Sequence, residues 1–197
     1  MKRCAAEAAS LLMSCRGGTA ILLAASIVLS ATASAGAAPL RIVAIGASNT
    51  HGWYIGKDAA YPAQLQALLK AKGVDARIVN AGVPFDTTAA MRNRIDADVP
   101  KGTDIVILQP GANDRRFLGT KEQRAANIAE MERRLKARSI KVIVYDDEIP
   151  LRYYAFDLIH LTRDGHAMIA AALLPRVMAI AGRGRGAAPP KAEARQP

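Results

Sequence analysis

Four short runs of apolar, largely β-branched residues recur along the chain, and longer amphipathic segments separate them. The runs cover residues 40–45, 76–80, 104–108 and 141–145. Nearly continuous apolar runs of this length are typical of strands that are covered on both faces, as in a parallel sheet. Strands that alternate with helices build βαβ units. The pattern therefore predicts an α/β fold, a three-layer α/β/α sandwich around a flavodoxin-like parallel sheet of four to five strands.

The segments between these runs have the apolar spacing of helices. We expect helices at residues 61–72, 87–95, 122–138 and about 163–181. Asp86 is a cap-like residue before the second helix, and the spacing of Thr120 to Gln123 matches a capping box before the third. The last helix is rich in alanine, and we expect Pro175 to interrupt it.

The first 37 residues have the pattern of a signal peptide. A basic start leads into the uncharged stretch 19–30, and small residues follow. We expect cleavage after Ala35 or Ala37 and a periplasmic or secreted protein. The apolar stretch is shorter than the roughly 20 residues that a spanning helix needs, so no stable membrane insertion is expected after cleavage.

Two alternatives concern this leader. Met13 would begin a more ordinary signal peptide, so the true start of the protein stays open, and the residues before Cys15 only faintly resemble a lipoprotein site. Both cysteines, Cys4 and Cys15, lie in the leader. The mature chain would then have no thiol, which excludes disulfides, thiolate zinc sites and a cysteine nucleophile.

The remaining chain is the right length for one domain, residues 38–182, which we expect to be a monomer. Residues 183–197 are rich in Gly, Pro and charge, and they predict a disordered basic tail. The net charge is +10. The basic residues are scattered and no aromatic residues are interleaved with them, so we expect a solvated surface and no nucleic-acid partner. Attraction to anionic envelope surfaces remains the alternative.

Polar residues follow each predicted strand. They lie in the segments 46–50, 80–82 and 111–114, and a fourth segment, 157–160, precedes the last helix. Because ligands of an open α/β sheet bind outside the carboxyl ends of its strands, we expect these segments to meet at one edge.

A serine nucleophile needs a base, a group that orients the base, and donors for the oxyanion. Ser48 is one of two serines after the leader, and Ser139 is predicted at the opposite end of the sheet. The spacing of Asp157 to His160 lets the carboxylate orient the imidazole, so these two residues complete a predicted triad with Ser48. His51 is too close to Ser48 in sequence to serve as its base, although it could line the pocket; the less favoured alternative base is His166.

The oxyanion donors are predicted from the same edge. Gly82 would let its backbone N–H approach closely, Asn113 would add a side-chain amide, and the Ser48 N–H would be the third donor.

Ser48, Gly82, Asn113 and His160 follow in this order in blocks at successive strand ends. The chain thus resembles the SGNH (GDSL) hydrolase superfamily over residues 40–180, and most closely its small exported thioesterase, lysophospholipase and arylesterase branch. The resemblance implies hydrolysis of a small-molecule acyl ester or thioester through an acyl-enzyme, with no metal and no cofactor.

Two features depart from the family pattern. Ala47 stands where the family has an acidic residue that supports the loop, so we expect altered activity. The segment between the fourth strand and Asp157 is shorter than in the family, which leaves Tyr153 to Phe156 as a stub of a fifth strand and predicts an open site. The acidic residues 146–148 in that connection would bind a cation or, as we favour, face solvent.

Three other functions are alternatives to this hydrolase. The same residues would serve an O-acetyl esterase that acts on envelope polysaccharide. The two departures would also fit a non-catalytic binding or accessory module with the same fold. A flavodoxin-like nucleotide binder is disfavoured, since no Gly-rich phosphate loop follows the first strand.

Overall fold

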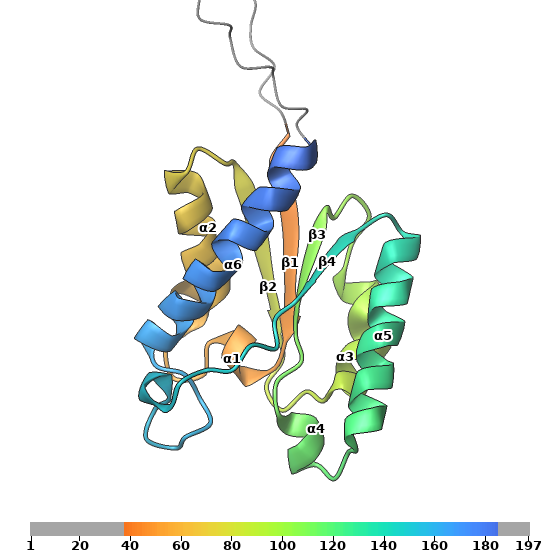
Figure 1. Ribbon diagram of the computed structural model, residues 1–197, viewed down its shortest axis with the longest axis vertical. Helices are drawn as coiled ribbons and strands as arrows, with labels where there is room; N and C mark the ends of the chain where they lie inside the picture. Colours follow the sequence, from red (N-terminus) through yellow and green to blue (C-terminus); the bar gives the residue numbers. More distant parts are fainter. Residues whose placement is uncertain (1–37, 185–197) are drawn as a thin grey trace, which may run out of the picture. The chain divides into compact units, whose positions relative to one another are not determined.

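The computed structural model describes residues 38–184, which form a four-stranded parallel sheet flanked by helices (Figure 1). The strands follow the spatial order β2-β1-β3-β4, with every neighbouring pair parallel. Their bounds are β1 Leu40–Gly46, β2 Ala76–Gly82, β3 Ile105–Gln109 and β4 Lys141–Val144. All four predicted strands are therefore confirmed, each to within two residues at either end.

Two helices cover each face of the sheet, which confirms the predicted α/β/α layers (Figure 1). One face carries α2 (Tyr61–Ala71) and α6 (Arg163–Gly184), and the other carries α3 (Thr88–Asp98) and α5 (Lys121–Ala137). Successive residues of a strand point to opposite faces. Ile42 of β1 accordingly belongs to the core under α2 and α6, and Val43 belongs to the core under α3 and α5.

The carboxyl ends of the central strands finish at one level, because Gly46 of β1 pairs with Gly82 of β2 and with Gln109 of β3. The short helix α1 (Ser48–His51) lies against this end of the sheet. A Cβ atom on Gly82 would lie 2.2 Å from the His51 backbone nitrogen, and one on Gly46 would lie 2.0 Å from Thr50 Oγ1. The two glycines therefore let α1 approach the strands more closely than any side chain would allow.

Of three predictions about the helices, one is confirmed and two are wrong. Thr120 and Gln123 form the predicted capping box at the start of α5. The cap of α3 is Thr87, whose hydroxyl accepts from the Ala90 N–H, and not Asp86. Helix α6 also runs without interruption through Pro175, in contrast to the expected break.

The fifth strand is absent from the described residues. Residues Leu151–Tyr153 form a 3-10 helix, and one antiparallel bridge joins Tyr154 to Leu161. The connection after β4 folds back on itself here instead of joining the sheet. The predicted leader, 1–37, lies outside the described residues, as does nearly all of the tail; α6 continues to Gly184, two residues into the segment predicted as disordered.

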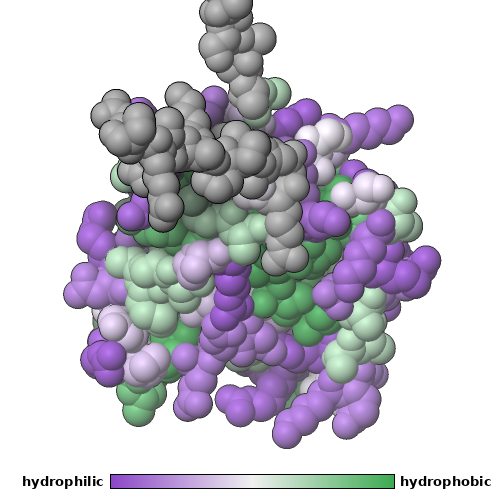
Figure 2. Space-filling view, turned by 45° about the horizontal axis from the view of Figure 1, so that its top comes forward, coloured by the Kyte–Doolittle hydropathy of each residue, from purple (hydrophilic) through white to green (hydrophobic). Residues whose placement is uncertain are grey.

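Helix α6 is long and apolar enough to cross a membrane by length and composition alone. In the fold it packs against α2, and Ile169, Leu173 and Val177 are fully buried in the core. It therefore serves here as a core helix. Figure 2 shows hydrophilic residues over most of the outline of the molecule, with apolar residues mainly between them.

Candidate active site

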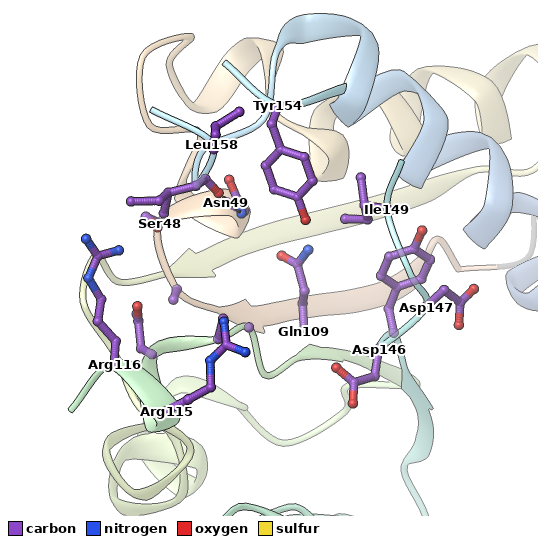
Figure 3. Close-up of a pocket in the computed structure, with 16 residues that line it drawn as sticks. Ser48, Asn49, Gln109, Arg115, Arg116, Asp146, Asp147, Ile149, Tyr154 and Leu158 are labelled. Atoms are coloured by element: carbon purple, nitrogen blue, oxygen red, sulfur yellow. Dashed lines mark hydrogen bonds between the residues drawn. The ribbon is translucent and has the colours of Figure 1, made fainter. Parts of the chain in front are cut away.

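A cavity of about 460 Å³ opens at the carboxyl end of the sheet. Ser48, Asn113 and Gln109 line it, together with residues of the connection after β4. Figure 3 shows the side chains of Gln109 and Tyr154 pointing toward each other across the hollow. The predicted nucleophile and one predicted oxyanion donor thus share one cavity.

Asp157 and His160 form a close pair. Asp157 Oδ2 lies 2.5 Å from His160 Nδ1, and Asp157 Oδ1 accepts the backbone N–H groups of Ile159 and His160, each at 3.0 Å. These bonds favour the ionised carboxylate. The His160 N–H, then the imidazole and the Ile159 N–H, hold the pKa of Asp157 well below its usual range.

Asn49 ties this pair to the turn that carries Ser48. Its amide nitrogen donates to the Ile159 carbonyl at 3.2 Å, and its side-chain oxygen accepts the Leu161 N–H at 3.0 Å. Both anchor points are direct neighbours of His160 in the chain. Asn49, the residue after the predicted nucleophile, is therefore hydrogen-bonded to the chain on both sides of His160.

Two aromatic rings hold the imidazole from the other directions. Trp53 stacks on His160 with ring centroids 5.3 Å apart, and Tyr54 meets the same ring edge-on, also at 5.3 Å. The Asp157 contact at Nδ1 and the two aromatic contacts together hold the imidazole ring in one orientation. Within residues 38–184, His160 Nε2 and Ser48 Oγ make no hydrogen bond, so the structure pairs Asp157 with His160 but does not show the predicted hydrogen bond between Ser48 and His160.

The three predicted oxyanion donors differ in their present partners. The Asn113 amide donates to the Asp86 carbonyl at 2.9 Å, which fixes its orientation and leaves its second N–H bond available. The Ser48 N–H makes no hydrogen bond to any described residue. The Gly82 N–H donates to Asn80 Oδ1 at 3.0 Å, so a catalytic role for it requires this bond to be shared or exchanged.

Arg94 is a site-supporting residue that the sequence does not indicate, because it lies among the scattered basic residues of the chain. Its guanidinium donates to the carbonyls of Gly46 and Ala81 and pairs with Asp86 at 2.6 Å. One side chain thus joins the ends of β1 and β2 to the connection that positions Asn113. A basic residue at mid-helix gave no sequence signal for this role.

Ala47 is 6% exposed and belongs to the apolar core between the sheet and α3 and α5. Ala47 also lines the cavity beside Ser48, where it presents a methyl group in place of the family's acidic side chain.

None of the three histidines is among the residues that line the cavity, although Leu158 and Ile159, next to His160, do line it. His51 Nδ1 lies 3.2 Å from the Gly82 carbonyl. His166 is fully buried in α6, where Nδ1 accepts the Tyr61 N–H at 3.1 Å, and burial lowers its pKa to about 4. Its Nε2 has no partner among the described residues.

The acidic connection after β4 is largely neutralised by arginines. Asp146 pairs with Arg124 at 2.6 Å, and Asp147 pairs with Arg176. Over the described part of the chain, no group of three or more His, Cys, Asp or Glu residues is placed to hold a metal ion.

Comparison with known proteins supports the same fold. The model of the GDSL-like lipase/acylhydrolase family matches residues 44–151, so the segment with Asp157 and His160 follows the matched region. Esterase TesA of Pseudomonas aeruginosa is 29% identical over 111 residues, which are 56% of this chain and 51% of TesA. The match thus spans about half the length of that relative.

Solved structures of esterases are also similar to this chain. A crystal structure of TesA aligns with a TM-score of 0.65 at 18% identity, over 71% of this chain and 99% of that one. AlinE4, an SGNH-hydrolase family esterase, aligns with a TM-score of 0.53 at 28% identity, over 70% and 73% of the two chains. With the family model covering more than half of its length, the chain belongs to the GDSL-like lipase/acylhydrolase family, the SGNH hydrolases.

Proposed function

We propose that this protein is an exported serine esterase or thioesterase that hydrolyses acyl esters through an acyl-enzyme on Ser48. The observation that carries the proposal is the Asp157–His160 pair, held by Asn49 against the turn that begins with Ser48. A nucleophile, a base and a group that orients the base are the minimum set for acyl transfer by serine.

In the proposed reaction, His160 Nε2 takes the proton of Ser48 Oγ as that oxygen attacks the acyl carbonyl carbon. The carbonyl oxygen becomes an oxyanion, which the Ser48 N–H, the Asn113 amide and the Gly82 N–H would stabilise. When the carbonyl re-forms, the bond to the alcohol or thiol breaks, and the imidazolium returns its proton to the leaving group. Water then attacks the acyl-enzyme by the same route and releases the acid.

Asp157 has two tasks in this scheme. Accepting from Nδ1–H fixes the tautomer in which Nε2 has the free lone pair. Its lowered pKa also keeps the carboxylate charged while His160 is protonated, which stabilises the imidazolium.

Export is proposed from the leader pattern in residues 1–37. The names of the relatives support an ester substrate, since TesA and AlinE4 are both described as esterases. An O-acetyl ester of a polysaccharide would use the same residues and is distinguished only by assay with the matching substrates.

The test is labelling of the mature protein with a fluorophosphonate probe, followed by identification of the labelled peptide by mass spectrometry. We expect Ser48 to be labelled and Ser48→Ala to lose all labelling. The matched control is Ser139→Gly, which changes the other serine of residues 38–197; Ser139 has φ of 61°, a conformation that glycine adopts without strain. This control should label like the wild type.

A folded wild-type protein that is not labelled would contradict the proposal. It would favour a non-catalytic binding module with the same fold. If Ser48 is labelled but no ester, thioester or O-acetyl glycan is hydrolysed, the proposed substrate class is contradicted and the assignment of Ser48 as the nucleophile stands.

A further inference from the structure

Exposed apolar side chains are concentrated at one end of the molecule. The segments that follow the four strands are residues 47–60, 83–87, 110–120 and 145–162. Among the described residues, ten large apolar side chains are exposed, and all but Leu68 and Val79 lie in these four segments. A random scatter of single exposed residues needs no explanation, but a concentration around one edge does.

The backbone adds a second, independent observation. Five non-glycine residues in the described part of the chain have left-handed φ angles, and four of them are among these exposed residues. They are Tyr54, Phe85, Leu118 and Leu158, one in each of the four segments. Bulky side chains disfavour this conformation, for which glycine or asparagine is the usual choice.

Neither burial in the core nor backbone preference accounts for these four residues. Their exposed fractions are 58%, 64%, 95% and 67%, so they contribute little to the core. Strained conformations that persist in this way are typical of functional sites. We call Tyr54, Phe85, Phe117, Leu118, Phe156 and Leu158 the apolar rim.

Four residues of the apolar rim, Tyr54, Phe85, Phe156 and Leu158, lie close to the proposed catalytic groups. Tyr54 contacts both the His160 ring and the Phe156 ring, the latter with centroids 5.6 Å apart. Phe85 lies edge-on to Trp53 at 5.7 Å, and Trp53 stacks on His160. Leu158 lines the cavity with Ser48.

Two arginines lie beside the apolar rim with no acidic partner. Arg115 and Arg116, in α4 (Asn113–Arg116), line the cavity and are exposed, and their guanidinium groups form no ion pair or hydrogen bond within residues 38–184. Figure 3 shows both projecting from α4 toward the level of Ser48. The nearby Asp146 and Asp147 are already neutralised by other arginines, so this side of the cavity mouth is net positive.

We propose that the apolar rim, with Arg115 and Arg116, docks the protein on the surface of an anionic phospholipid bilayer, with the Ser48 cavity opening toward the lipid. Apolar side chains that enter the headgroup region and cations that meet anionic headgroups are the two contributions that hold peripheral proteins on membranes. A second copy fits this surface less well, since a symmetric contact would bring two sets of unpaired arginines together. The biological role rests on the proposed hydrolase, but the docking itself does not.

The experiment is cosedimentation with vesicles of phosphatidylcholine, with and without phosphatidylglycerol. Every protein tested has the Ser48→Ala change, so the lipid stays intact and the result is independent of hydrolysis. We expect binding to the vesicles with phosphatidylglycerol, weakening as salt is added, and little binding to phosphatidylcholine alone.

Two sets of variants separate the contributions. Phe85→Asn with Leu118→Asn should weaken binding about tenfold or more and should raise thermal stability, because asparagine tolerates left-handed φ angles. A merely structural role would give the opposite sign of stability change. Arg115→Gln with Arg116→Gln should weaken binding to the phosphatidylglycerol vesicles about thirtyfold.

The matched controls are Leu68→Gln and Val79→Thr, which alter the two exposed apolar residues outside the four segments. Both should bind like the parent. The proposal is overturned if the parent protein does not bind the anionic vesicles, if the rim variants bind as well as the controls, or if the protein is a dimer that Leu118→Asn dissociates.

Discussion

At the end of the sheet where the strands begin, the connections from helix to strand are three to six residues long, whereas at the end where they finish the connections run from five to eighteen residues. The short turns use left-handed residues such as Gly73, Gly102 and Ser139. The long connections hold the proposed triad, the cavity and the apolar rim. One end therefore closes the fold with the fewest residues, and the other places side chains for chemistry.

The largest expected effect on kcat comes from replacing one aspartate at each end of the sheet with asparagine. Asp157→Asn is expected to lower kcat about 10⁴-fold while the fold remains, because the amide would favour the wrong imidazole tautomer. Asp104, at the beginning of β3, accepts the Arg41 N–H at 2.7 Å, and Asp104→Asn should leave kcat unchanged. Steady-state kinetics on a chromogenic ester would decide. Equal losses in both variants would mean that Asp157 acts only through stability.

The pH dependence of stability should also originate at the end of the sheet where the strands finish. His166 accepts the Tyr61 N–H there, joining the beginnings of α6 and α2, and burial lowers its pKa to about 4. Since the unfolded imidazole titrates near 6.5, the unfolded state binds more protons below that pH. Stability is therefore fully present above about pH 6.5, and about 3 kcal/mol is lost as the pH falls toward 4.

Denaturant unfolding at several pH values would measure this loss. His166→Gln keeps an acceptor for the Tyr61 N–H but does not titrate, so its stability should be nearly flat over that range. The same slope in the variant would assign the effect to other groups.

The smallest predicted effect compares two arginines that donate to backbone carbonyls. Arg94 joins Gly46, Ala81 and Asp86 at the carboxyl end, while Arg138 donates to the Val99 carbonyl at the other. Arg94→Lys and Arg138→Lys should each cost about 1–2 kcal/mol in unfolding free energy. Only Arg94→Lys should also lower kcat, by about tenfold, because it loosens the connection that positions Asn113. Equal kcat values for the two variants would argue against this support.

Much of the fold was predictable because local signals agreed with the global structure. The four apolar runs are the four strands, and the Thr120 capping box begins α5. The cap of α3 was wrongly predicted because Asp86 looks like a cap in sequence, while its carboxylate is taken by Arg94 from the same helix. Such a partner eight residues away leaves no mark in a local pattern.

For the candidate site, the sequence predicted one contact and missed others. The Asp157 to His160 spacing predicted the pair that the structure brings to 2.5 Å. The side chain of Asn49 makes hydrogen bonds to Ile159 and Leu161, which lie 110 and 112 positions further along the chain. No periodic pattern in the sequence indicates a contact over such a separation. The left-handed residues of the apolar rim were also missed, since Tyr, Phe and Leu are poor candidates for that conformation.

Trp53 is the only tryptophan of the chain, and its ring lies against the His160 imidazole. The protein therefore has an intrinsic fluorophore in contact with its proposed base. A charged imidazolium next to an indole quenches its emission more strongly than the neutral ring does, so the emission intensity reports the charge on His160. Acylation, inhibitor binding or lipid contact at this edge would then be followed in real time with unlabelled protein, and no other tryptophan contributes to the signal.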